Sequence, residues 1–151
     1  MRIPPALQKL GLAAGILVVG AFAYWYYAPR CVSGNCENGF GTKAQNGVFR
    51  YTGSFQNGRA HGQGTFESLQ SDHRYEGQWQ NGHMHGNGRY EYPDGIVYSG
   101  EWKHNQRTGT GRLFHMPTDA EYYNGLWEND SPLETSHSTI PENVRRAAMI
   151  E

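Results

Sequence analysis

Two hydrophobic patterns divide the chain. From Leu10 to Ala28, about 19 consecutive positions carry no charge, and as a helix rising ~1.5 Å per residue they would span ~28 Å of hydrocarbon. Arg2 and Lys9 precede this run, and the aromatic residues 24–27 close it, as in an interfacial belt. We therefore predict a single-pass transmembrane helix within residues 1–30, with its N-terminus cytoplasmic and the following domain on the extracytoplasmic side.

A cleaved signal segment is the alternative reading of the same run. The small residues Ala21 and Ala23 flank Phe22, which is an acceptable cleavage site, although the apolar run continues past it. Cleavage near Ala23 would give a secreted domain in place of an anchored one.

Beyond residue 50 the pattern changes to alternation of apolar and polar residues, which is the period of a β-strand. One string recurs: an aromatic residue, glycine and a second aromatic at alternate positions, then a turn, then two glycines at alternate positions. Its leading tyrosines are Tyr51, Tyr75, Tyr98 and Tyr123, which are 24, 23 and 25 residues apart. Self-similarity at a nearly fixed period indicates a repeat architecture. The predicted repeats are 31–47 (degenerate), 51–72, 75–95, 98–119 and 123–130 (truncated).

Each complete repeat predicts one β-hairpin. Asn57-Gly58, and the equivalent pair at 81–82, lie between alternating residues and favour a two-residue type I′ turn, which needs positive φ at both central positions. Asn105 replaces glycine in the third copy and tolerates that conformation. The register expected from such a turn pairs Phe55 with Ala60, Gly53 with Gly62 and Tyr51 with Gly64. One face is then aromatic over glycine and the other is polar.

The predicted fold is all-β: an elongated single-layer antiparallel sheet of eight or nine strands, built from stacked hairpins over residues 31–130. The remaining segment, 131–151, lacks the pattern. Pro141 and Glu142 favour the start of a short helix over 143–150, whose apolar residues would cap the last hairpin. A flexible tail is the alternative for this segment.

The repeated string resembles the MORN (membrane occupation and recognition nexus) repeat, whose pattern is Tyr-x-Gly-x-Trp, a turn, then Gly-x-Gly-x-aromatic. The resemblance covers about residues 31–130. It implies one hairpin per repeat in an elongated sheet, and a role in protein assembly or membrane-associated scaffolding. The third copy departs from the pattern at Asn105, and the fourth is truncated.

Composition and charge exclude several classes of function. Of the 151 residues 20 are glycine, and 13 Lys+Arg against 14 Asp+Glu leave a net charge of -1, so no overall field steers the chain toward nucleic acid. Arginines and glutamates are interleaved along the repeats, so no polybasic patch for lipid headgroups is expected. Neither a nucleophile elbow nor a phosphate-cradling loop is present. The sequence predicts no enzyme and no cofactor.

The histidines invite a metal interpretation. His83 and His85 fall on one strand face beside the thioether of Met84, a group that suits copper or zinc. However, His61 and His85 occupy the same repeat position, so the recurrence of a strand residue explains them, and two ligands without a carboxylate or thiolate partner rarely suffice. The sequence therefore predicts no metal site.

The two cysteines, Cys31 and Cys36, follow the apolar run. In an oxidising compartment a disulfide between them would close a small loop. Two free thiols on a cytosolic domain are the alternative.

The aromatic ladder is the candidate binding surface, because a single-layer sheet has no second layer to cover it fully. Its members are Tyr51, Phe55, Tyr75, Trp79, Tyr98, Trp102, Tyr123 and Trp127. The glycines expected to be structural are Gly53, Gly62, Gly64, Gly77, Gly86, Gly88, Gly100, Gly109 and Gly111. We expect a membrane-anchored, non-catalytic scaffold that docks a protein partner on the sheet, with a carbohydrate- or lipid-binding module as the alternative.

Overall fold

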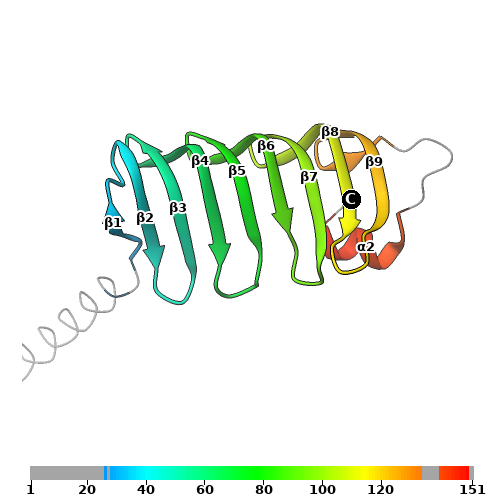
Figure 1. The fold of residues 1–151 in the computed structure, drawn as a ribbon, viewed down its shortest axis with the longest axis horizontal. Helices are drawn as coiled ribbons and strands as arrows, with labels where there is room; N and C mark the ends of the chain where they lie inside the picture. Colours follow the sequence, from blue (N-terminus) through cyan, green and yellow to red (C-terminus); the bar gives the residue numbers. More distant parts are fainter. Residues whose placement is uncertain (1–25, 27, 134–139, 150–151) are drawn as a thin grey trace, which may run out of the picture.

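The computed structural model describes residues 26, 28–133 and 140–149, and these form a strip-like antiparallel sheet with one short helix. All ten strands are hydrogen-bonded in chain order, and they stand side by side along the long axis (Figure 1). The strands are β1 (Arg30–Gly34), β2 (Gly39–Gln45), β3 (Phe49–Gln56), β4 (Arg59–Ser68), β5 (Arg74–Gln80), β6 (His83–Glu91), β7 (Ile96–Lys103), β8 (Gln106–His115), β9 (Ala120–Glu128) and β10 (Ser131–Pro132). The all-β single sheet is confirmed, with a short first and a short last strand beyond the expected eight or nine.

The predicted transmembrane segment lies almost entirely outside the described residues. No helix in the part of the chain that the structure describes is long and apolar enough to cross a membrane.

Two-residue turns of the predicted type connect the hairpins. Both central residues have positive φ at Asn57 (50°) and Gly58 (70°), and again at His104 (51°) and Asn105 (70°), so asparagine does replace glycine in the third turn. Each turn also bonds to the preceding repeat: the Gly58 N–H donates to the Glu37 carbonyl, and the same bond recurs one, two and three repeats later. Those later bonds join Gly82 to Ala60, Asn105 to Met84 and Asp130 to Arg107.

The register differs from the expected one beyond the first pair of each hairpin. Phe55 pairs with Ala60 as predicted, but Gly53 pairs with Gly64 and Tyr51 with Phe66. β4 holds two more residues than β3 between the first two of these pairs, which forms a bulge. Gly62 lies in this bulge with φ of 75°, a conformation open to glycine. Because the shift is two residues, the two faces keep the predicted composition.

The corrected register aligns one glycine from each of the first nine strands in a continuous row. Each glycine pairs directly with the next across the sheet. The row consists of Gly34, Gly41, Gly53, Gly64, Gly77, Gly88, Gly100, Gly111 and Gly125.

The helix α2 (Glu142–Ala147) lies beside the C-terminal strands (Figure 1). Pro141 precedes it, as the sequence predicts. Val144, Ala148 and Ile140 are buried in one cluster with the aromatic residues of the later repeats. The helix therefore covers the aromatic face at this end of the sheet, where the sequence predicted a cap on the final hairpin.

Candidate functional site

The eight predicted aromatic residues form one continuous ladder. Neighbouring rings meet edge to face, with centroids 5.0 to 5.5 Å apart, in the order Phe55, Tyr51, Trp79, Tyr75, Trp102, Tyr98, Trp127 and Tyr123. Such contacts contribute roughly 0.5–1.5 kcal/mol each beyond the area that they bury. The ladder thus links every repeat to the next.

Hydrogen bonds fix the rings on the glycine row. The Tyr75 hydroxyl donates to the Gln78 carbonyl at 2.9 Å, and the Trp79 indole donates to the Gly64 carbonyl at 3.0 Å. The equivalent tyrosine bond is made by Tyr51, Tyr98 and Tyr123, and the equivalent tryptophan bond is made by Trp102 and Trp127. From Gly53 to Gly125, a side chain on the glycine row would therefore collide with a tyrosine side chain.

Burial separates Trp79 from the rest of the ladder. The other seven side chains are at most 6% exposed, whereas Trp79 is half-buried. The difference arises because each ring packs against the next and because α2 covers the later repeats. The sequence pattern alone does not reveal these contacts. The ladder as a whole is core, and solvent reaches it mainly beside Trp79.

Burial also sets an alkaline limit on stability. It raises the pKa of the Tyr51 hydroxyl from about 10 to about 12, and that of Tyr92 to about 12 although the Arg107 charge opposes the rise. Because the folded protein favours the neutral hydroxyl, this contribution is intact below pH ~10 and is lost as the pH rises toward ~12. We expect denaturant unfolding midpoints to be level from pH 8 to 10 and to fall at pH 11, in step with tyrosinate absorbance. A midpoint that does not fall at pH 11 would contradict this assignment.

An open apolar groove of about 430 Å³ lies on the aromatic face of the earlier repeats, which we call the N-terminal groove. Tyr51 and Phe55 lie in it, and its rim includes Pro29, Lys43 and the turn residues Gly58 and Asn105. Its remaining large apolar side chains, all half-buried, are Phe49, Phe66, Trp79, Met84 and Tyr90. Apolar surface that stays accessible is typical of binding sites.

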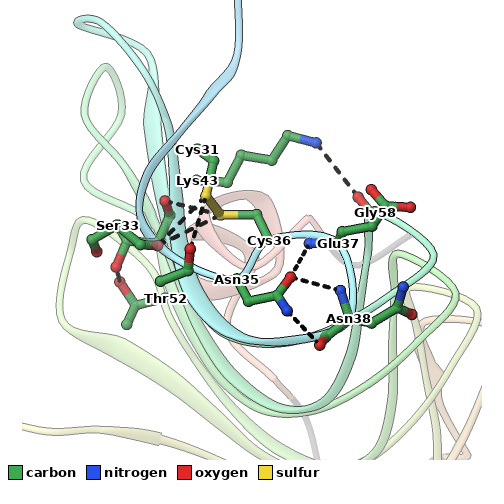
Figure 2. The surroundings of a disulfide bond; sticks show 11 residues. Cys31, Ser33, Asn35, Cys36, Glu37, Asn38, Lys43, Thr52 and Gly58 are labelled. Carbon is green, nitrogen blue, oxygen red and sulfur yellow. Dashed lines mark hydrogen bonds between the residues drawn. A yellow bond between two sulfur atoms is a disulfide. The ribbon is translucent and has the colours of Figure 1, made fainter.

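A disulfide joins Cys31 to Cys36 at the first edge of the sheet, as the sequence predicted. Figure 2 shows Lys43 extending past it toward Gly58, where the ammonium donates to the carbonyl at 3.4 Å. Asn35 accepts from the backbone N–H groups of Glu37 and Asn38 and closes the loop between the two cysteines. The disulfide-closed loop thus lies next to Lys43 and Gly58, which also line the groove.

Removing the disulfide has a modest expected cost. Replacing both cysteines by serine should lower the free energy of unfolding by about 2 kcal/mol, because the closed loop is short. Denaturant titrations of the oxidised and the double-serine chain would measure it. A difference above ~4 kcal/mol would mean that the bridge does more than close a loop.

The opposite face is polar and its charges are largely neutralised. Arg74 lies 2.7 Å from Glu76 and 3.8 Å from Glu91, and Arg112 lies 2.6 Å from Glu121. A shallow hollow of about 550 Å³ on this face is lined by Arg89 and Arg112, which both already bind carboxylates. The predicted interleaving of charges thus holds in space.

Three histidines gather near one turn. The His104 ring is 6.0 Å from both the His83 and the His85 rings, centre to centre. The Met84 N–H donates to the side-chain oxygen of Asn105, and the side-chain nitrogen of Asn105 donates to His83 Nδ1 at 2.8 Å. Across 28–133 and 140–149, no three His, Cys, Asp or Glu side chains are placed to hold a metal ion.

Sequence reasoning missed Arg107, which is 2% exposed. It occupies the repeat position of Ala60 and Met84 and pairs with Trp102 across the strands. Its guanidinium contacts Asp130 at 3.0 Å and donates to the carbonyls of Ala148 and Met149 at 2.8 and 3.2 Å. A charged residue at an otherwise apolar position of a repeat was the signal that could have found it.

Comparison with protein families agrees with this architecture. The family model of the MORN repeat matches residues 51–68, 75–97 and 98–114, which are the three complete hairpins with their aromatic and glycine positions. These segments are MORN repeats. Repeats of this family are non-catalytic modules that generally bind proteins or membranes. No curated protein matches the chain closely enough to count as a relative.

Proposed function

We propose that this chain is a membrane-anchored, non-catalytic binding module that docks a protein partner in the N-terminal groove. One observation carries the proposal: the aromatic face is covered by α2 over the later repeats and is left as an open apolar groove over the earlier ones. Partners bind through a few apolar and aromatic side chains in such places.

The proposed anchor would put the groove close to the bilayer. Pro29, in the groove rim, follows directly on the apolar run that ends at Ala28. A helix crossing the membrane would therefore deliver the chain to the groove within a residue or two. The natural partner in this arrangement is a protein at the extracytoplasmic surface of the same membrane.

A matched pair of variants on β4 tests the docking surface. Ala60 lines the groove, whereas Gln63 is exposed on the polar face, so Ala60→Glu and Gln63→Glu place the same charge on opposite sides of one strand. After crosslinking in intact membranes and affinity purification, Ala60→Glu should reduce capture of the specific partner at least about tenfold. Gln63→Glu should leave it unchanged.

The same pair separates the alternative function. Equal capture by both variants, with binding to liposomes or a glycan array lost only in Ala60→Glu, would replace protein docking by lipid or carbohydrate binding. Trp102→Ala is unsuitable here because Trp102 is buried in the core.

The compartment has its own test. An extracytoplasmic domain should carry the Cys31 and Cys36 thiols in oxidised form, so alkylation of intact cells before lysis should label neither. Stoichiometric labelling at both positions would place the repeats on the reducing side and reverse the proposed orientation.

A further inference from the structure

The chain contains its own example of what the aromatic face binds. Val144 and Ala148 are four residues apart on α2, and with Ile140 they are at most 2% exposed against the later repeats. Spacing of this kind places apolar side chains on one side of a helix. This face of a MORN sheet therefore accepts a short amphipathic helix within this molecule.

The surface under α2 continues into the N-terminal groove. Phe66, Trp79, Met84 and Tyr90 pack against the cluster that includes α2, and the same four side chains line the groove. The pair Tyr75–Trp79 has the geometry of Tyr98–Trp102, with edge-to-face centroids 5.1 Å apart in both. The same ring pair thus recurs one repeat earlier, where Tyr75 is buried and Trp79 stays half-buried.

One cation lies beside each of the two surfaces, although the two residues hold different positions in the repeat. Arg107 contacts Asp130 in the last turn and donates to the carbonyls at the end of α2. Lys43 donates to the Gly58 carbonyl in the first turn. Gly58 and Asp130 hold the same position in the repeat, but Glu37, not Lys43, holds the position of Arg107 there. Among the described residues Lys43 forms no ion pair. A cation beside the last carbonyls of a helix stabilises it.

We infer that the N-terminal groove binds an amphipathic α-helix of the protein partner, with apolar side chains at every fourth residue on the groove and its C-terminal end beside Lys43. The inference rests on the proposed function and names the kind of partner segment. It follows from the continuity of the groove with the α2 interface and from the presence of a cation, Lys43, in the groove lining.

The test uses a probe taken from this chain. A peptide of residues 140–149, acetylated and amidated so that its termini carry no charge, is titrated into the full-length protein in phosphatidylcholine nanodiscs. The readouts are the NMR signals of the Trp79 indole, the Met84 methyl group and, as a reference site beneath α2, the Trp127 indole. The control peptide carries Val144→Asp.

We expect the chemical shifts of the Trp79 and Met84 signals to change with a measurable dissociation constant, while that of Trp127 stays constant. The control peptide should change none of them. Lys43→Gln should weaken binding roughly two- to fivefold, and less at high salt, as a helix-end charge does. Movement of Trp127 alone would mean exchange with α2, and unchanged affinity in Lys43→Gln would remove the predicted orientation.

The outcomes separate this inference from the proposed function. If partner capture depends on Ala60 and the peptide does not move Trp79 or Met84, docking stands and the helical segment is wrong. If vesicles of phosphatidylglycerol move Trp79 and the peptide does not, the groove takes lipid, and both proposals fail.

Discussion

Replacing Gly100 by alanine is expected to lower the free energy of unfolding by about 3 kcal/mol, although the change adds one methyl group. A Cβ at this position would lie 2.5 Å from the Gly111 Cα, 2.6 Å from the Thr110 carbonyl oxygen and 2.6 Å from the Tyr98 hydroxyl. Two of these contacts are with backbone atoms of the paired strand, which cannot move away without disrupting the strand pairing. The Tyr98 ring would have to leave the glycine row and lose its bond to the Glu101 carbonyl.

Gly82→Ala supplies the control for this prediction. Gly82 has φ of 87° and nothing within 4 Å of an added Cβ, so only the cost of the left-handed backbone remains, about 1 kcal/mol. Chemical denaturation of both variants, followed by tryptophan fluorescence, would measure the difference. Equal losses would mean that the glycine row is not closed by the tyrosine rings.

Replacing Arg107 by methionine is expected to cost about 3 kcal/mol and to loosen α2. Methionine is the residue at this repeat position in the preceding copy, Met84, so the strand accepts it. The cost comes from the partners left behind: the Asp130 carboxylate, the Tyr92 hydroxyl and the two carbonyls that follow α2. Backbone amide exchange at Ala148 should rise more than exchange in β3 or β4.

Arg112→Met is the matched control on the same strand. Arg112 also bonds two carboxylates, at 2.6 and 3.1 Å, but its side chain is 36% exposed, so solvent screens these pairs and their loss should cost little. If Arg107→Met costs no more than Arg112→Met, the buried arginine is not what holds the helix.

The sequence was sufficient for the repeats, the turn type and the two faces of the sheet. Asn57-Gly58 requires one turn geometry, and alternation of residues then assigns Tyr51 and Phe55 to one side. The pairing of Cys31 with Cys36 was the only one possible, but the sequence left open whether the two thiols are oxidised. The short helix after Pro141 followed from helix-start preferences.

The register and the extent of the groove were not predictable in this way. An ideal hairpin pairs Gly53 with Gly62. The local sequence does not indicate that Gly62 adopts positive φ and forms a bulge. Coverage of the ladder depends on contacts between α2 and strands some 40 residues away, such as that of Arg107 with Ala148. Long-range contacts of this kind decide which aromatic residues are core and which can bind.

The turn-to-carbonyl bonds between successive repeats have a consequence for how such a chain can grow. Each repeat offers the next one the same backbone carbonyl for the turn bond and the same aromatic ring for the ladder contact. A duplicated copy of residues 75–97 would therefore fit against the repeats on both of its sides. The copy would add two strands, or ~10 Å of sheet. It would lengthen the open part of the aromatic face, and α2 would still cover the last repeats. Gene duplication can therefore alter the reach of this protein in fixed steps without redesigning either end.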